Sequence, residues 1–358
     1  MLFIEALRAL PQEARYVRVD VADGMARLTA SLPEGQISAQ FEGEEPEGSY
    51  AVDGKVVRLA RALAPEASVK RRGERLRLEA AGGSYAFSTL AADTVPVLAE
   101  PERWDPVAVD PAKFRQALTY VGEAAATQDL RYYLNAVFVR FDTDRYEAVA
   151  SNGHVAAIAA GDGAHCSGKA QIILPRKCVA EIVRLLDEGA KVEFGRKTSG
   201  GAMLRVSSRG LAYLGLGFDA VYPDYARIFE GNQPSSSASF EANAFAAALT
   251  RLQFTADAKT PVLRLAFESA SLRMTCADDA GKDGAETLAA VQSAFDGQFE
   301  CGLNPHYGAA AVAAALECAK DVSLGWVSAQ KAITIGPVMA EGAAASEIRK
   351  WIVAPLRA

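Results

Sequence analysis

The sequence predicts an α+β protein in which one structural unit is repeated three times. Two observations lead to this prediction. An amphipathic helix pattern recurs near the start of each third of the chain. Segments with alternating apolar residues, which are typical of strands with one buried face, follow it in the same order each time.

The first helix pattern is Phe-x-x-Ala-Leu followed by an apolar residue one turn later. It begins at Phe3, Phe114 and Phe245, which places the apolar side chains on one helix face. Asp110 and Pro111 precede the second copy and predict an N-cap residue followed by proline at the first helical position.

The strand patterns follow these helices in a constant order. Each first strand has an arginine between two apolar residues, at Arg18, Arg140 and Arg264. A second amphipathic helix is predicted over residues 56–63, 179–186 and 309–316, and a further strand begins six residues later at Val69, Val192 and Val322. Three unrelated α+β pieces are the alternative, but the ordered recurrence favours triplication.

Two polar connections separate the predicted units. Residues 98–110 contain two prolines and several charges, and residues 231–239 are rich in glycine, proline and serine. We therefore predict three domains over residues 1–106, 107–234 and 235–358.

Composition narrows the class of protein. Half of the 358 residues are hydrophobic, and no apolar segment is long enough to span a bilayer, so we expect no membrane partner. The amino end lacks a cleavage-site pattern, and the five cysteines include no CxxC, which favours reduced thiols and a cytoplasmic location. The net charge of −6 implies either that DNA is not a partner or that the cations gather on one surface.

No enzyme signature is present. The sequence contains no GxxxxGK[ST], HExxH or GxSxG motif, and its three histidines stand in no pattern that names a nucleophile or a metal partner. The acidic pairs at Asp142 and Asp144 and at Asp278 and Asp279 are more typical of solvated turns than of a cation site. We expect a non-catalytic protein without cofactor or metal.

Several segments resemble one known family. They are 128–135 (QDLRYYLN), 149–154 (VASNGH), 173–177 (ILPRK), 222–225 (YPDY), 87–93 (FSTLAAD) and the terminal 352–357 (IVAPLR). In this order, over nearly the whole chain, they resemble the beta subunit of bacterial DNA polymerase III, the beta sliding clamp. That family has three similar domains of the DNA clamp fold, each with two helices packed on antiparallel sheets, assembled as a ring.

The resemblance implies a processivity factor. Family members form a head-to-tail homodimer around duplex DNA, without sequence preference, with helices lining the hole. They tether the DNA polymerase III alpha subunit, the clamp loader and other proteins that carry a clamp-binding motif. A contact between unlike surfaces that closes on itself makes a ring rather than a filament.

The resemblance also implies two sets of site residues. DNA contact is expected, from helix cations and a matching loop, at Arg8, Arg58, Arg61, Gln128, Arg131, Tyr132, Tyr133, Arg176 and Lys177. A peptide-binding pocket between domains two and three is expected from Leu134, Ser151, Gly153, His154, Val155, Ala156, Pro223, Arg227, Ile228, Ile352, Val353, Pro355, Leu356 and Arg357.

Departures from the family pattern leave alternatives open. Val155 and Ala156 replace longer side chains and predict an altered, shallower pocket. The predicted helix 309–316 has no cation, so the third domain would contribute less to DNA contact. A clamp-fold scaffold or decoy that binds clamp-binding peptides without encircling DNA is therefore the second hypothesis, and a free monomer the third. By resemblance, Phe254 and Thr255 lie near the subunit interface.

Overall fold

The structure is a computed structural model that describes residues 2–43, 46–168, 170–198, 200–268, 270–295, 297–340 and 347–356. The chain divides into two compact units. Unit 1 contains Met1–Ala112 and Lys177–Asp219, and unit 2 contains Lys113–Arg176 and Ala220–Ala358.

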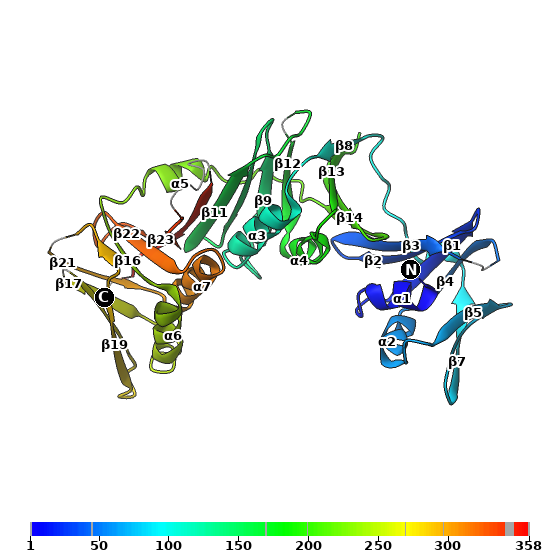
Figure 1. Ribbon diagram of the computed structural model, residues 1–358, viewed down its shortest axis with the longest axis horizontal. Coiled ribbons are helices and arrows are strands. Elements are labelled where there is room, and N and C mark those ends of the chain that lie inside the picture. The colour runs from blue at the N-terminus through cyan, green and yellow to red at the C-terminus, as the bar shows by residue number, and fades with distance from the viewer. Residues whose placement is uncertain are drawn as a thin grey trace. The chain divides into compact units, whose positions relative to one another are not determined.

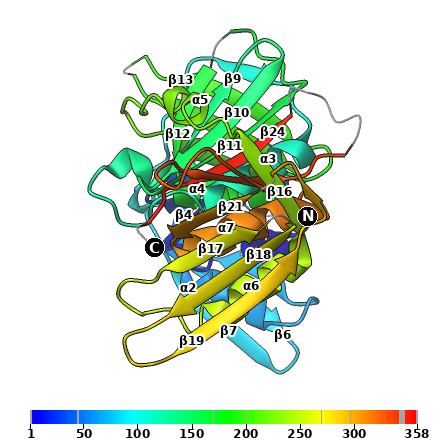
Figure 2. The same ribbon diagram turned by 90° about the vertical axis from the view of Figure 1, so that its left-hand side faces the viewer.

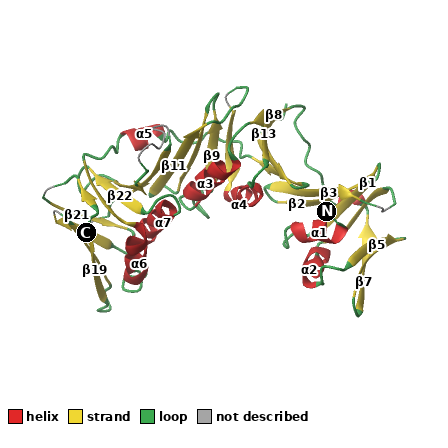
Figure 3. Cartoon of the chain, in the orientation of Figure 1, coloured by secondary structure: helices red, strands yellow, loops and turns green. Residues whose placement is uncertain are grey.

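The order of elements repeats three times along the chain, as a helix, four strands, a helix and three strands (Figures 1 and 3). The first set is α1 (Phe3–Ala9), β1 (Tyr16–Ala22), β2 (Met25–Leu32), β3 (Gly35–Glu42), β4 (Gly48–Asp53), α2 (Lys55–Ala62), β5 (Ser68–Arg72), β6 (Arg75–Ala80) and β7 (Gly83–Leu90). The second is α3 (Pro111–Gly122), β9 (Ala136–Phe141), β10 (Arg145–Ser151), β11 (Val155–Asp162), β12 (Ala170–Pro175), α4 (Arg176–Leu185), β13 (Lys191–Arg196), β14 (Ala202–Ser208) and β15 (Leu211–Leu216). The third is α6 (Ala242–Leu252), β17 (Leu263–Glu268), β18 (Ser271–Ala277), β19 (Asp283–Ala289), β21 (Gln298–Leu303), α7 (Pro305–Leu316), β22 (Asp321–Trp326), β23 (Ile333–Pro337) and β24 (Ile348–Val353).

The strands pair in the same order in each of the three sets. In every set the first strand pairs with the second and the fourth, and the last three strands form a meander. The additional strand β8 (Trp104–Val107) pairs with β13, and β16 (Ser236–Glu241) pairs with β22. The predicted α+β class, the six helices and their order are confirmed by these elements.

Unit 1 contains one antiparallel sheet of eleven strands, in the order β5-β6-β7-β4-β1-β2-β3-β15-β14-β13-β8. Side chains alternate between its two faces. One face carries apolar residues such as Leu28, Ile37 and Phe41, and Phe41 contacts Phe3 of α1 with ring centroids 5.4 Å apart. The other face, around β2, β3 and β14, carries polar side chains, so the helix covers only the apolar face.

Unit 2 contains two antiparallel sheets. Nine strands follow the order β12-β9-β10-β11-β24-β23-β22-β16-β20, where β20 is Gln292–Ser293, and four follow β19-β18-β17-β21 (Figure 2). Phe114 of α3 contacts Phe141 and Tyr146, and the Trp351 indole donates to the backbone oxygen of Tyr120, 3.3 Å away. These contacts define the helix face of the nine-stranded sheet; the opposite face is called the outer face.

The structure adds two strands to the elements predicted from the sequence. β8 lies within the first polar connection and pairs with β13, and β16 begins within the second and pairs with β22. The structure does not test the three domain boundaries. All five cysteines are unpaired, and among the described residues no helix is long and apolar enough to cross a membrane.

Candidate functional site

The predicted peptide-site residues meet where β11 pairs with β24. Ala156 lies opposite Ile352, and Val155 lies opposite Val353. Paired residues point to the same side of a sheet and consecutive residues to opposite sides. Ala156 and Ile352 therefore face outward with Ser151, which pairs with Ala156 on β10. Val155 and Val353 lie on the same face as Trp351, which contacts α3, so their side chains belong to the core beneath the helices. All four side chains are at most 4% exposed, so Ala156 and Ile352 are also covered on the outer face.

The turn between β10 and β11 is held by its own side chains. The Asn152 carboxamide oxygen accepts from the backbone N–H groups of His154 and Val155 at 2.9 and 3.0 Å. The Ser151 hydroxyl donates to Val155 O and accepts from Gly153 N–H. Gly153 has a φ of +88°, which a residue with a side chain rarely adopts. The turn is thus a rigid support for the exposed His154 ring.

The carboxyl end of β24 runs beside this turn. Ala354 N–H donates to His154 O at 2.9 Å, and Leu356 N–H donates to Gly302 O at 2.7 Å. The His154 ring stacks on Tyr307 of α7, with centroids 6.0 Å apart. Pro355 and Leu356 are partly exposed there, whereas Arg357 lies outside the described residues.

The segment that leaves β15 crosses the outer face of the same sheet. Tyr222 stacks on Phe138 of β9 at 5.2 Å, and the Tyr225 hydroxyl donates to the Glu147 carboxylate of β10 at 2.7 Å. Further along, Gln233 accepts from Lys350 of β24 at 3.5 Å. Burial raises the pKa of Tyr225 and lowers the pKa of Lys350, which shows that the crossing segment shields this face from water.

Between these contacts the segment forms the short helix α5 (Ala226–Glu230). Pro223, Arg227 and Ile228 are all exposed, and Arg227 pairs only with Asp224, 3.0 Å away. Ile228 is an exposed apolar residue of the kind that a docking peptide covers. Leu134 differs, because it is 4% exposed at the end of the 3₁₀ turn Tyr132–Leu134.

The loop predicted to touch DNA lies beside the turn. Arg131 makes a bidentate ion pair with Asp129, at 3.0 and 2.8 Å, and this guanidinium holds the pKa of Asp129 at about 2. A side chain at Gly153 would meet the Arg131 guanidinium at 3.0 Å, so the loop and the turn pack together. Gln128 and Tyr132 are exposed and Tyr133 is partly buried, with the two tyrosine rings 6.0 Å apart.

Two predicted DNA-contacting arginines have a structural role. Arg8 of α1 donates three hydrogen bonds of 2.7–2.8 Å to the backbone oxygens of Ala60, Leu63 and Ala64, at the end of α2. Arg61 of α2 donates in return to the oxygens of Arg8 and Leu10, at the end of α1. The C-terminal end of a helix has unpaired carbonyl groups and a partial negative charge from the helix dipole. Each arginine hydrogen-bonds these carbonyl groups on the other helix and places its positive charge beside them.

The remaining predicted cations divide into paired and unpaired groups. Arg176 donates to Ala125 O at 3.0 Å and pairs with Glu123 at 2.8 Å, whereas exposed Lys177 has only a loose pair with Glu34 at 3.8 Å. Within the described part of the chain, the exposed Arg58 forms no side-chain hydrogen bond or ion pair. Arg58 is therefore the predicted cation most available to a phosphate.

Some contacts were not predicted from the sequence. Tyr307 and Glu123 support His154 and Arg176, but they come from other parts of the sequence and carry no motif. In the ranges that the structure describes, no group of three or more His, Cys, Asp or Glu side chains is arranged to hold a metal ion. Asp278 accepts instead from the backbone of its own turn.

The chain is similar to bacterial replication proteins. A model of the central domain of the DNA polymerase III beta subunit matches residues 108–224. The beta sliding clamp of Vibrio cholerae is 27% identical over 296 residues, covering 80% of this chain and 78% of that protein. The beta sliding clamp of Escherichia coli is 24% identical over 347 residues, covering 95% and 90%.

Solved structures agree on the fold. The DNA polymerase III subunit beta of Pseudomonas aeruginosa matches with a TM-score of 0.85 at 19% identity, covering 99% of this chain and 96% of that one. A second structure from that organism, a sliding clamp bound to griselimycin, also has a TM-score of 0.85 at 19% identity, covering 99% and 97%. Together with the repeated helix and strand order, these matches show that the chain has the fold of the DNA polymerase III beta subunit and is similar over nearly its whole length to the bacterial beta sliding clamps.

Proposed function

We propose that this sliding clamp closes a head-to-tail homodimeric ring around duplex DNA and tethers DNA polymerase and other replication proteins to it. The observation that carries the proposal is the threefold repeat, in which each set has two helices and the same strand pairing. Repeated units joined through unlike surfaces form a closed ring when their rotation sums to a full turn. The domains are proposed to be 1–106, 107–234 and 235–358, and the location to be the cytoplasm.

DNA contact is proposed for the cations on the helices rather than for the sheets. Arg58 on α2 and Arg115 on α3 are exposed and form no side-chain pair with any residue that the structure describes. α7 has no cation, and Arg251 of α6 pairs with Glu286 at 2.6 Å. Contact would thus come mainly from the first two sets. Such a surface binds phosphates without reading sequence, and weak contact lets a ring slide.

The test is retention on DNA that has no ends. The clamp is loaded onto a nicked circular plasmid, and its retention during gel filtration is compared before and after the plasmid is cut at one site. A topological ring is retained on the circle and lost from the linear molecule. Equal loss from both would support the scaffold or decoy that does not encircle DNA, and a solution mass near 37.9 kDa, measured by light scattering, would support a monomer.

We also propose that clamp-binding peptides dock on the outer face at the junction of β11 and β24. Support comes from the convergence there of Ala156 and Ile352, and from the exposed Ile228 on the segment that crosses this face. Apolar anchors beside a few polar groups suit the capture of an extended peptide. The small Ala156 leaves a shallow surface, so we expect weaker peptide binding than a larger side chain would allow.

The docking proposal is tested with Ile228→Asp and Val291→Asp. Both replace an exposed apolar residue of unit 2, but Val291 lies in the turn between β19 and β20. We expect Ile228→Asp to weaken binding of a fluorescent polymerase-derived peptide by about tenfold, while Val291→Asp leaves the affinity unchanged. Equal affinity of both variants and the wild type, measured by fluorescence anisotropy, would reject this surface.

A further inference from the structure

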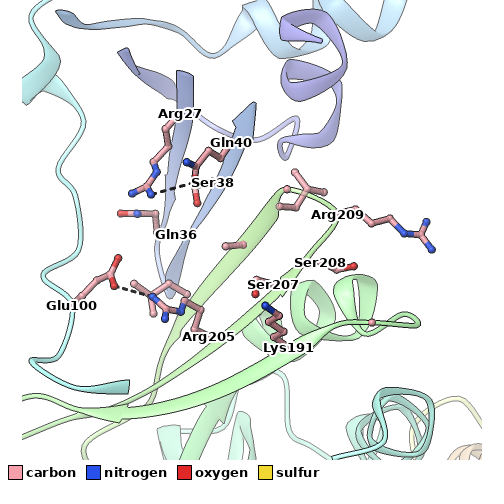
Figure 4. Close-up of a pocket in the computed structure, with 15 residues that line it drawn as sticks. Arg27, Gln36, Ser38, Gln40, Glu100, Lys191, Arg205, Ser207, Ser208 and Arg209 are labelled. Atoms are coloured by element: carbon pink, nitrogen blue, oxygen red, sulfur yellow. Dashed lines mark hydrogen bonds and ion pairs between the residues drawn. The ribbon is translucent and has the colours of Figure 1, made fainter. Parts of the chain in front are cut away.

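We propose that unit 1 contains a second docking surface, on the polar face of its sheet, that binds an extended acidic segment of a partner protein. The surface is a pocket of about 340 Å³ on β2, β3, β15, β14 and β13 (Figure 4). It lies on the face of the sheet opposite α1. It also belongs to a different compact unit from the peptide surface of β11 and β24.

Strand register explains why polar side chains gather here. Lys191 pairs with Ser207, Ser207 with Ala212, and Ala212 with Ser38, while Arg27 pairs with Gln40, two residues along β3 from Ser38. Paired residues point to the same side of a sheet, and so do residues two apart on one strand, so this row has a cation at each end and hydroxyl and amide groups between them. The register of each strand pair therefore fixes which side chains lie in this row.

Neither terminal cation forms an ion pair within the described ranges. Arg27 makes a long hydrogen bond of 3.4 Å to Gln40 and lies opposite Asp20, whose carboxylate pairs with Arg18 instead at 2.9 Å. Lys191 makes no side-chain hydrogen bond or ion pair there. The other two cations of the pocket are already neutralised. Arg205 pairs with Glu193 at 2.7 Å and Arg209 with Asp187 at 3.0 Å.

One segment of the chain shows how this polar face of the sheet binds a carboxylate. Residues 96–100 cross the same face, where Leu98 N–H donates to the Gln36 carboxamide at 2.9 Å. Glu100 of this segment accepts from the Arg205 guanidinium at 3.0 Å (Figure 4). It also accepts from the Trp104 indole at 3.0 Å. A crossing peptide that carries an acidic side chain is thus already seated at one side of the pocket, while Arg27 and Lys191 remain available.

The spacing of these two cations selects an extended ligand. β2 and β13 are four strand positions apart, so the Cα atoms of Arg27 and Lys191 are separated by roughly 19 Å at the usual strand spacing. Because strand side chains stand roughly perpendicular to the sheet, the two cationic groups stay far apart and a single phosphate or carboxylate does not bridge them. An extended peptide of about six residues spans it, and residues two apart place their carboxylates on one side.

A peptide fits better than single-stranded nucleic acid. Proteins that bind single strands stack bases on exposed aromatic rings. The residues lining this pocket include no aromatic side chain, and the neighbouring Trp104 ring is covered by the Arg205 guanidinium, 4.4 Å from its centroid. The lining offers serine hydroxyls and glutamine amides, which bind peptide carboxylates and backbone groups equally well.

The test uses a fluorescent eight-residue peptide of alternating aspartate and alanine, with an octathymidylate and a peptide of alternating lysine and alanine as comparison probes. Anisotropy is measured with the wild type, with the double variant Arg27→Gln and Lys191→Gln, and with Lys331→Gln plus Arg273→Gln as a control of equal charge. Both control residues are exposed and lie in unit 2. Urea unfolding checks that all three proteins are equally stable.

We expect the acidic peptide to bind the wild type and the control, and to bind the double variant about tenfold more weakly, the product of roughly threefold for each exposed ion pair. Equal binding to the double variant and the control would overturn the proposal. Tighter binding of the octathymidylate, with the same sensitivity to the double substitution, would also overturn it and assign the pocket to nucleic acid. Retention on circular DNA, measured in parallel, separates a failure of this surface from a failure of the ring.

Discussion

Replacement of Arg8 separates a structural role from a DNA-binding role. The guanidinium donates three hydrogen bonds to carbonyl oxygens at the end of α2, at 2.8, 2.7 and 2.8 Å. The hydrogen bonds to Ala60 and Leu63 are partly buried and the one to Ala64 is exposed. A partly buried hydrogen bond contributes about 1 kcal/mol, and a cation at a helix end adds a few tenths. We expect Arg8→Met to destabilise the end of α2 by about 2–3 kcal/mol.

The change is measured by hydrogen exchange of the α2 amides, because the effect is local. A loss of about 2 kcal/mol corresponds to a fall of about 30-fold in protection. Arg8→Lys keeps the charge but offers one nitrogen in place of a fork, so we expect protection to fall by about fivefold to tenfold. Arg58→Met is the matched control on α2. It should leave exchange unchanged and weaken DNA retention.

The role of Arg8 as a cap of α2 would be refuted if hydrogen exchange of the α2 amides were unchanged in Arg8→Met. If that variant also lost DNA retention while Arg8→Lys kept it, Arg8 would act as a phosphate contact instead. Lost protection in both variants, with DNA retention no more sensitive to salt than in the wild type, would support the cap, because salt screens phosphate contacts and not the geometry of a hydrogen-bonded helix end.

Three further predictions concern separate parts of the chain. The pKa of Asp129, about 2 in the native protein, is expected to return toward 3.8 in Arg131→Gln when followed by NMR titration; since the native value is the lower one, any stability from this pair is present above pH 3.8 and is lost as the pH falls toward 2. Burial raises the pKa of Cys301 to about 12, so iodoacetamide at pH 8 should not modify this thiol until the protein unfolds, as mass spectrometry would show. Phe254, which is 79% exposed, is proposed to lie at the subunit interface, so Phe254→Asp should halve the mass measured by light scattering; an undiminished dimer would remove this residue from the interface.

The sequence by itself determined the helices, the strands and their threefold order. This was possible because apolar side chains recur with the period of the element that buries them, as at Phe3, Phe114 and Phe245. The sequence also showed the resemblance to the beta sliding clamps, because the matching segments are short continuous stretches of residues. The ends of the connections were not predictable, because a strand that pairs with a distant partner needs no apolar alternation of its own.

Only the tertiary structure decided what the individual side chains do. Arg8 and Arg61 have the spacing of exposed helix cations, yet each caps the other's helix, because the two helices end beside one another. Val155 and Ala156 are neighbours in sequence but lie on opposite faces of a sheet, and pairing with β24 fixes which one is outside. The row from Arg27 to Lys191 likewise joins residues 164 positions apart, and no local pattern contains the strand register that brings them to one face.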